Sequence, residues 1–564
     1  MRNTHRNHWP AGLPQSLSVP QTSIFANLEI SCRRFPERTA LVYYDTATSY
    51  SRLYSETLAL AGWLQQVGSV QRGDRVLLCM QNSPQFVVAY YAILRADAVV
   101  VPVNPMLTSG ELEYIATDSG ARMAIVAQEV LPAFDPLVGA PSRSPLQSIL
   151  VATYSDALRS ETTLEVPAFV SAPRGDLFTP NVFAWHQALS SNLSPQPHLS
   201  EPQDIAVLPY TSGTTGQPKG CIHTHHNVMH TAVAGPLWTG GIYPDAVALT
   251  IVPMFHVMGM QTCMNALIYC GGAIVILPRW NRETAGELIT RYCVTHWVNI
   301  PTMIIDLLAS PRFGEFDISS LRQISGGGTA MPAAVAQRLY DLTGQRYIEG
   351  YGMTETMGTT HCNPIHRPKQ QCLGLPTFGV RALVIDPESV VERSPSEVGE
   401  ILISGPQVFR GYWNDEAKST EAFVRIDGVQ YLRTGDLGYV DEDGYFFFVD
   451  RLKRMINASG FKVWPAEVES MLYNHVEIQE CCVIASPDAY RGETVKALVV
   501  LKPNSSLGAE DIAAWARDNM ASYKAPRIVD LVSSLPKTAS GKVLWRVLQE
   551  EERARALTIG READ

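Results

Sequence analysis

The stretch that decides the fold reads Tyr-Thr-Ser-Gly-Thr-Thr-Gly-Gln-Pro-Lys-Gly over residues 210–220. It follows an apolar, strand-like run, Ile205–Tyr210, and precedes a helical pattern over His225–Val233. A strand, a loop of small residues and a helix in this order form a usual scaffold for phosphate, because backbone N–H groups and the helix N-terminus face the anion. The loop is not a Walker loop, since Gly220 rather than Ser or Thr follows Lys219. A flexible surface turn is the alternative, which the position between strand and helix disfavours.

Strand-like and helical runs alternate on both sides of this loop. We expect a strand at Arg75–Met80, a helix at Pro84–Leu94 and a strand at Ala98–Val103. A further helix follows Met331, and a short strand, Arg346–Ile348, then enters a loop flanked by glycines. This alternation predicts an α/β fold with a parallel sheet, and ligands bind at such strand ends. Pro136–Pro202 breaks the pattern, and we expect loops and edge elements there.

The chain becomes strand-rich past Gly399, with runs at Glu400–Ile403, Leu437–Val440 and Tyr445–Val449. From Arg451 onward, helical and strand-like segments mix in a short α+β pattern. A large α/β body followed by a short α+β section predicts a small separate C-terminal domain.

Length, composition and charge narrow the class of protein. The chain has 564 residues, 46% of them apolar and 18% charged, as expected for a globular enzyme of several domains rather than a disordered chain. Its net charge of -10 disfavours nucleic acid as a partner. The apolar stretch Phe86–Val103 is interrupted by Arg95 and Asp97, and the first residues lack the apolar core of a secretion signal. We therefore expect no integral membrane segment, while peripheral membrane contact and a homodimer stay open.

Cysteine usage indicates the compartment. The ten cysteines are scattered, with no C-x-x-C pair and no regular spacing. This usage is typical of reduced thiols, and we expect a cytoplasmic location.

Six further motifs follow the loop in order. They are Ser325-Gly326-Gly327-Gly328, Tyr351-Gly352-Met353-Thr354-Glu355, Thr434-Gly435-Asp436, Asp450-Arg451-Leu452-Lys453, Ser459-Gly460-Phe461 and Pro536-Lys537-Thr538-Ala539-Ser540-Gly541-Lys542. Together with the loop, they resemble the signature of the adenylate-forming (ANL) superfamily of AMP-binding enzymes. This superfamily includes acyl-CoA synthetases, peptide-synthetase adenylation domains and beetle luciferases.

The resemblance implies a large N-terminal AMP-binding domain over residues 1–450, with mixed and parallel sheets flanked by helices and a distorted β-barrel-like part. It also implies a small, mobile C-terminal α+β domain over residues 451–564, with a hinge near residues 450–453 at Lys453. Rotation at the hinge would exchange Lys542 for the Ser459-Gly460-Phe461 loop, so that one pocket runs two half-reactions.

The resemblance assigns binding and catalytic residues. The cofactor-binding residues that it implies are Thr211, Ser212, Gly213, Thr214, Thr215, Lys219, Gly326, Gly327, Gly328, Tyr351, Gly352, Thr354, Asp436, Arg451, Gly460, Phe461 and Lys542. The catalytic residues that it implies are Thr354, Glu355, His256 and Lys542.

The residue types suit these roles. Tyr351 can stack on adenine, the Thr354 hydroxyl can donate to the α-phosphate, and the Glu355 carboxylate suits Mg²⁺. Asp436 can accept from both ribose hydroxyls, and a hairpin would bring Arg451 beside it. Two of these assignments have a plainer alternative. Glu355 by itself would be a solvated loop carboxylate, and the sequence Thr-Gly-Asp is also common in turns.

The C-terminal lysine would act on the transition state. A preorganised ammonium at Lys542 that meets the carboxylate and the α-phosphate would supply about 2.7 to 4 kcal/mol to adenylate formation. An exposed surface lysine is the alternative.

The acyl partner is indicated by Pro253–Met260 and the following Met264. His256 matches a family position at the mouth between the acyl pocket and the thiol tunnel, although a lone histidine is more often a core residue. The methionines of this stretch suit an adaptable apolar wall, and equally an ordinary core. The stretch contains no acidic residue to recognise an amine. A zinc site at His223, His225 and His226 is disfavoured, because no spaced partner set accompanies them.

These observations predict an ATP-dependent ligase that uses ATP, Mg²⁺ and coenzyme A. It would activate a carboxylic acid, a medium- or long-chain fatty acid in the first place, as acyl-AMP and transfer the acyl group to CoA. The alternatives are adenylation of an aryl or other acid, loading of a separate carrier protein, a luciferase-like oxidoreductase and a non-catalytic nucleotide-binding regulator. Chain length, oligomeric state, pathway and a role for residues 1–21 stay open.

Overall fold

The computed structural model describes residues 4–138, 144–177, 179–211, 217–241, 243–328, 330–458, 461–488, 492–503, 505–537 and 543–562. The chain divides into two compact units, one with residues 3–381 and 403–432 and one with residues 382–402 and 433–564. The predicted boundary at residues 450–451 falls inside the second unit and stays a prediction.

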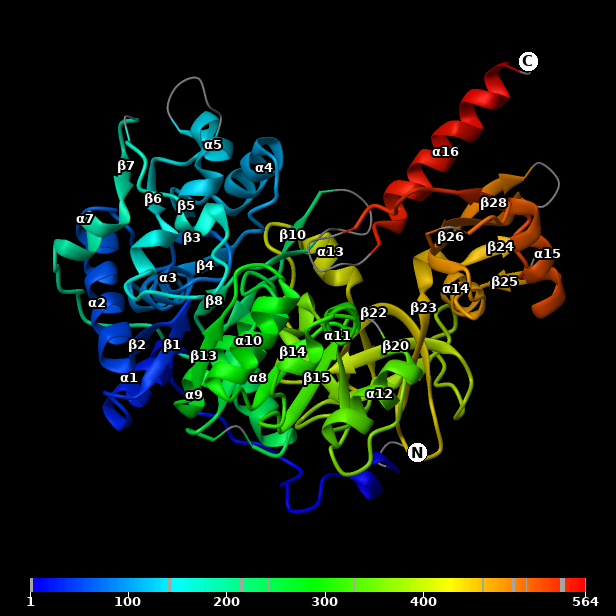
Figure 1. Cartoon of the computed structure of the whole chain (residues 1–564), viewed down its shortest axis with the longest axis horizontal. Coiled ribbons are helices and arrows are strands. Elements are labelled where there is room, and N and C mark those ends of the chain that lie inside the picture. The colour runs from blue at the N-terminus through cyan, green and yellow to red at the C-terminus, as the bar shows by residue number, and fades with distance from the viewer. Residues whose placement is uncertain are drawn as a thin grey trace. The chain divides into compact units, whose positions relative to one another are not determined.

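The first unit contains a mixed sheet in the strand order β18-β17-β16-β15-β14-β12-β13-β1-β2. Figure 1 labels its strands β1, β2, β13, β14 and β15. The strands from β16 to β1 in this order run parallel, and antiparallel strands flank them at both ends. The strands are β1 (Thr39–Tyr43), β2 (Thr46–Ser49), β12 (Val247–Thr250), β13 (Ala273–Ile276), β14 (His296–Asn299), β15 (Gln323–Gly327), β16 (Tyr347–Met353), β17 (Gly358–Cys362) and β18 (Leu375–Pro376).

A second sheet of this unit has the order β11-β8-β4-β3-β5-β6-β7, and apart from β11 its strands run parallel. They are β3 (Arg75–Cys79), β4 (Val99–Pro102), β5 (Met123–Ala127), β6 (Ser148–Ala152), β7 (Val182–Ala184), β8 (Ile205–Val207) and β11 (His223–Thr224). The predicted strands at Arg75–Met80 and Ala98–Val103 are confirmed by β3 and β4. The proline-rich region supplies β6 and the edge strand β7.

The first unit contains helices with and without a side-chain cap at the N-terminus. They are α1 (Phe25–Arg34), α2 (Tyr50–Gln66), α3 (Pro84–Arg95), α4 (Ser109–Ser119), α5 (Leu131–Phe134), α6 (Ala168–Ser171), α7 (Trp185–Ser190), α8 (His225–Trp238), α9 (Ala266–Cys270), α10 (Arg282–Tyr292), α11 (Pro301–Leu308), α12 (Ala333–Thr343) and α13 (Glu416–Glu421). The N-cap of α2 is Ser49, whose hydroxyl accepts from the Arg52 N–H. The helix begins at the next residue, Tyr50. Helix α3, predicted at Pro84–Leu94, is buried on all sides, which explains its continuous apolar sequence.

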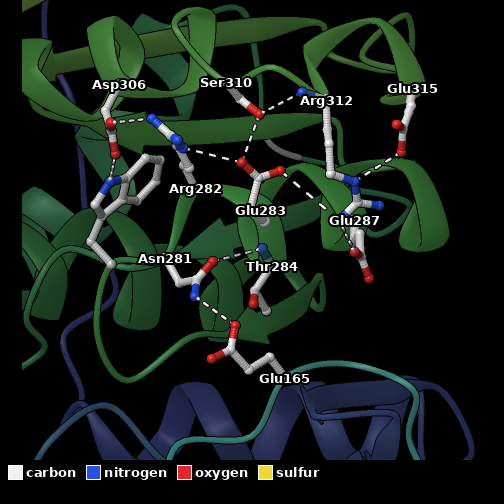
Figure 2. Close-up of polar contacts among 11 residues, drawn as sticks. Glu165, Asn281, Arg282, Glu283, Thr284, Glu287, Asp306, Ser310, Arg312 and Glu315 are labelled. Carbon is white, nitrogen blue, oxygen red and sulfur yellow. Dashed lines mark hydrogen bonds and ion pairs between the residues drawn. The ribbon is translucent and has the colours of Figure 1, made fainter.

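A polar network fixes α10 and α11 at the surface (Figure 2). Arg282 pairs with Asp306 at 3.1 Å, and the Trp280 indole N–H donates to the same carboxylate at 2.7 Å. Arg312 contacts Glu287 at 2.9 Å, and its side chain is 45% exposed. Exposed pairs of this kind contribute about 0–1 kcal/mol each, so the network orients helices that the core already holds.

The second unit contains the C-terminal α+β section. β22 (Val429–Val440) begins in the first unit and pairs in the second with β23 (Phe446–Arg451). β19 (Arg381–Ile385) and β20 (Gly399–Ser404) belong to the same sheet. β21 (Phe423–Ile426) lies in the first unit, where it pairs with the beginning of β22. A further sheet, β25-β24-β27-β26 with β28 beside β27, supports α14 (Pro465–Leu472), α15 (Ala509–Asn519) and α16 (Trp545–Glu562). Its strands are β24 (Ile456–Ala458), β25 (Phe461–Val463), β26 (Ile478–Asp488), β27 (Gly492–Leu501) and β28 (Ile528–Leu531).

The predicted fold class, an α/β body with a small α+β section at the C-terminus, is confirmed by this arrangement. Within the described ranges, no helix combines the length and the hydropathy that a membrane span requires.

Candidate active site

The two ends of the phosphate-binding loop predicted at residues 210–220 form a pair of short strands. β9 (Tyr210–Thr211) pairs antiparallel with β10 (Lys219–Gly220), so Thr211 lies opposite Lys219. The Tyr210 hydroxyl donates to the Asp118 carboxylate at 2.6 Å and anchors the base of the hairpin. The predicted residues Ser212, Gly213, Thr214 and Thr215 lie outside the described residues.

Glu355 lies close to this hairpin. It belongs to a short 3-10 turn, η7 (Thr354–Thr356), that follows β16, and it is only 8% exposed. The structure therefore excludes the solvated loop carboxylate that Glu355 would be by itself. Its Oε1 accepts from the Tyr412 hydroxyl at 3.0 Å, and its carbonyl oxygen accepts from the Phe409 N–H at 2.8 Å.

Thr354 is held through its backbone. Its carbonyl oxygen lies 2.7 Å from Nε2 of His223, a histidine with no exposed surface. Burial lowers the pKa of His223 to about 4, so the ring is neutral at pH 7 and donates from Nε2 to the carbonyl. The sequence indicated His223 only as part of a histidine cluster. Its contact with the turn that carries Thr354 and Glu355 needed the structure.

The predicted glycines lie at the ends of β15 and β16. A Cβ atom at Gly326 would come within 2.1 Å of the Asn299 carbonyl oxygen, and one at Gly352 within 1.9 Å of the Gly358 oxygen. Gly327 faces the Gly350 oxygen in the same way, at 2.5 Å. Neighbouring backbone therefore requires glycine at these positions whether or not a nucleotide binds. Gly328 has φ +89°, which also favours glycine.

Tyr351 lies on β16 between these glycines and is half-buried. Its ring centroid is 5.8 Å from that of His361, at an interplanar angle of 59°. Burial lowers the pKa of His361 to about 3, so Tyr351 has a neutral aromatic neighbour. Such a tyrosine can stack on a planar base.

Asp436 and Arg451 face each other across the β22–β23 hairpin in the second unit. The Arg451 Nε lies 3.1 Å from the Asp436 Oδ1. The Asp436 side chain is buried, whereas that of Arg451 is 44% exposed. A buried carboxylate with an adjacent cation suits a pair of sugar hydroxyls.

The predicted hinge residue Lys453 belongs to the 3-10 turn η8 (Leu452–Arg454), between β23 and β24. The next residue, Arg454, has a side chain that is 12% exposed, and it donates to the Glu469 carboxylate and, at 3.1 Å, to the Val483 carbonyl oxygen. Phe461 begins β25, while Gly460 and Lys542 lie outside the described residues.

The predicted acyl stretch leads into an element that sequence reasoning missed. His256 is exposed, and its Nδ1 accepts from the Met258 N–H at 3.4 Å. A π-helix, η5 (Gly259–Asn265), follows directly, and such helices occur frequently at functional sites. Met260 and Met264 are fully buried, as in an ordinary core.

The histidine cluster does not form a metal site. His223 contacts Thr354, whereas the His225 Nδ1 accepts from the Ile24 N–H at 3.1 Å. Among the residues whose positions are given, no group of three or more His, Cys, Asp or Glu side chains converges as a metal would require.

Comparison with known proteins identifies the family. Residues 28–413 match the model of the AMP-binding enzyme, and residues 467–542 match the AMP-binding enzyme C-terminal domain. This chain belongs to the AMP-binding enzyme family. The predicted superfamily and the prediction of an enzyme are thereby confirmed.

Relatives of this AMP-binding enzyme share nearly its full length. It is 36% identical to a long-chain-fatty-acid--CoA ligase of Bacillus subtilis, over 96% of this chain and 97% of that protein. It is 32% identical to a ligase of the same name from Escherichia coli O157:H7, over 98% and 99% of the two chains. The crystal structure of the anthranilate CoA ligase AuaEII with anthranoyl-AMP matches with a TM-score of 0.83 and 28% identity, over 97% and 99% of the chains.

ATP, Mg²⁺ and CoA are used by AMP-binding enzymes of this class, and the described residues fit the ATP and the Mg²⁺. Glu355 offers a buried carboxylate, and Mg²⁺ usually takes one or two carboxylates with water and substrate phosphates. Lys219 supplies a cation at the base of the phosphate loop. Tyr351 of the first unit is of a type that suits a planar base, and the pair Asp436–Arg451 of the second unit is of a type that suits sugar hydroxyls.

Proposed function

We propose that this AMP-binding enzyme is an ATP-dependent fatty acid:CoA ligase for acids of medium or long chain. The observation that carries the proposal is the identity of 36% over 551 residues with a protein named long-chain-fatty-acid--CoA ligase. The reaction converts acid, ATP and CoA into acyl-CoA, AMP and pyrophosphate.

The chemistry proceeds in two half-reactions. The carboxylate oxygen attacks the α-phosphorus of ATP, and the bond to pyrophosphate breaks, which yields acyl-AMP. The CoA thiolate then attacks the acyl carbon, and AMP leaves with the electron pair of the broken C–O bond. Adenylation is needed because a free carboxylate is a poor electrophile and AMP is a far better leaving group than hydroxide.

Residues of this chain take the following roles in the proposal. The hairpin from Thr211 to Lys219 and the backbone at Gly326–Gly328 and Gly352 bind the phosphates and the base, and Tyr351 stacks on adenine. Thr354 donates to the α-phosphate, and Asp436 with Arg451 binds the ribose. Glu355 would hold Mg²⁺, which would supply positive charge to neutralise the phosphates.

Lys542 stabilises the charge that develops during adenylation, and His256 lies at the mouth of the acyl pocket. In the proposal, the domains meet at residues 450–451, and rotation at Lys453 exchanges Lys542 for Gly460 and Phe461. The second half-reaction then uses the same pocket. The scattered free cysteines support a cytoplasmic location.

The second candidate is an aryl acid, favoured by the structural similarity to an anthranilate CoA ligase. A screen separates the two: acids of two to eighteen carbons and a set of benzoates are supplied, and AMP release is measured with and without CoA. We expect release that requires CoA and is greatest for medium- or long-chain acids. Preference for benzoates would support the aryl alternative, and acid-dependent pyrophosphate exchange without acyl-CoA product would indicate a separate carrier protein.

A further inference from the structure

Tyr412 connects two parts of the site that lie far apart in the sequence. Its hydroxyl donates to the Glu355 Oε1 at 3.0 Å, and its ring centroid is 5.0 Å from the Lys219 Nζ. The side chain therefore touches both the predicted metal carboxylate and the predicted phosphate-loop cation.

The backbone around Tyr412 is fixed against the strand that leaves the phosphate loop. The Trp413 N–H donates to the Gly220 carbonyl oxygen at 2.8 Å, and the Ile222 N–H donates to the Gly411 carbonyl oxygen at 3.0 Å. The Tyr412 N–H itself donates to the Ser419 hydroxyl at 2.8 Å. Because these hydrogen bonds lie on both sides of Tyr412, they fix the backbone that carries its side chain.

The ring is also enclosed from the side of the Glu355 turn. The Phe409 ring contacts the Tyr412 ring edge-on, with centroids 4.9 Å apart. The Phe409 N–H donates to the Glu355 carbonyl oxygen at 2.8 Å. One segment, residues 409–413, thus holds both the backbone and the carboxylate of Glu355.

We propose that Tyr412 is a positioning residue, which orients the Glu355 carboxylate toward the metal and keeps Lys219 at a fixed place beside it. This inference rests on the proposed function. A hydrogen bond to a carboxylate is about twice as strong as one between neutral groups. Because the Tyr412 hydroxyl binds Oε1 of Glu355, the other carboxylate oxygen faces away from Tyr412. The ring at the same time attracts the Lys219 ammonium through its face.

Tyr412→Phe tests the inference, because it keeps the ring and its contact with Lys219 but removes the hydroxyl. We expect Mn²⁺ binding, measured by electron paramagnetic resonance with α,β-methylene-ATP, to weaken by about 10- to 100-fold, the usual cost of losing a residue that orients a metal ligand. Acid-dependent pyrophosphate exchange should fall by a similar factor, and thioester formation from supplied acyl-AMP should change less than about twofold.

Two comparisons complete the test. Tyr243→Phe removes a hydroxyl from a tyrosine that is 60% exposed, and it should leave metal binding unchanged. When Tyr412→Phe is added to the Glu355→Gln variant, Mn²⁺ affinity should fall by less than about twofold further, because the two residues act through one contact.

Unchanged Mn²⁺ affinity in Tyr412→Phe would overturn the inference. So would an equal loss in both half-reactions together with reduced resistance to urea, since that pattern indicates a merely structural role. Absence of acid-dependent exchange in the unmodified enzyme would instead refute the proposed function, and the Mn²⁺ titration would still decide the role of Tyr412.

Discussion

Replacing Arg454 by methionine should destabilise the second unit strongly. The Arg454 side chain is 12% exposed, and it faces two acidic groups, Glu469 and, at 3.7 Å, Asp450. Its guanidinium carbon also lies 5.5 Å from the centre of the Trp545 ring, at the start of α16. Arg454→Met leaves two buried carboxylates without this cation. Breaking a buried pair in this way costs about 3–5 kcal/mol in the free energy of unfolding.

The loss of stability in Arg454→Met should depend on pH. Burial raises the pKa of Asp450 and of Glu469, and Arg454 opposes both shifts. Without the arginine, both pKa values rise further in the folded state. An acid whose folded pKa is raised loses stability as pH increases, so we expect a larger deficit at pH 8 than at pH 5.

Hydrogen exchange of the β26 and β27 amides in rising urea measures this unit separately from the first. Arg555→Met is the matched control, because Arg555 is 62% exposed and contacts Asp530 at 3.5 Å; it should cost less than about 1 kcal/mol. A deficit below about 1 kcal/mol for Arg454→Met, or one equal at both pH values, would refute the reasoning.

Four further outcomes are expected. Lys542→Ala should lower acid-dependent pyrophosphate exchange by about 10² or more and spare thioester formation from supplied acyl-AMP, and equal losses would contradict the division of roles. Lys453→Pro should spare exchange but block transfer to CoA, and normal overall turnover would remove the hinge. Burial lowers the pKa of His230 to about 4, so between about pH 6.5 and 4 the unfolded chain binds a proton that the native state does not. The urea midpoint should therefore fall as the pH is lowered from about 6.5 to 4, and it should fall less steeply in His230→Gln. Arg312→Ala should change the free energy of unfolding by less than about 1 kcal/mol, and a loss above about 2 kcal/mol would show that the surface network is structural.

Much of the fold follows from local sequence. The apolar runs at Arg75–Met80 and Pro84–Leu94 form β3 and α3, because turn residues and a helix cap mark where each run begins and ends. The π-helix at Gly259–Asn265 was missed, because its i→i+5 bonding leaves no periodic signal in so short a segment.

The site is only partly readable from sequence. The hairpin of Thr211 and Lys219 and the pairing of Asp436 with Arg451 are local, so spacing indicates them. The contact between Tyr412 and Glu355 joins residues 57 positions apart, and nothing near Tyr412 signals it. The N-terminal arm is similar: Trp9, to which the sequence assigned no role, packs edge-on against Trp238 with centroids 4.7 Å apart.

The glycines of β15 and β16 bear on how active and inactive relatives are told apart. Since a methyl group at Gly326 or Gly352 would collide with a carbonyl oxygen of the same sheet, a descendant that no longer made adenylates would still have to keep them. Their presence in a distant homologue therefore indicates a shared scaffold. Surviving chemistry is better judged from positions that bear side chains, such as Glu355 and Tyr412.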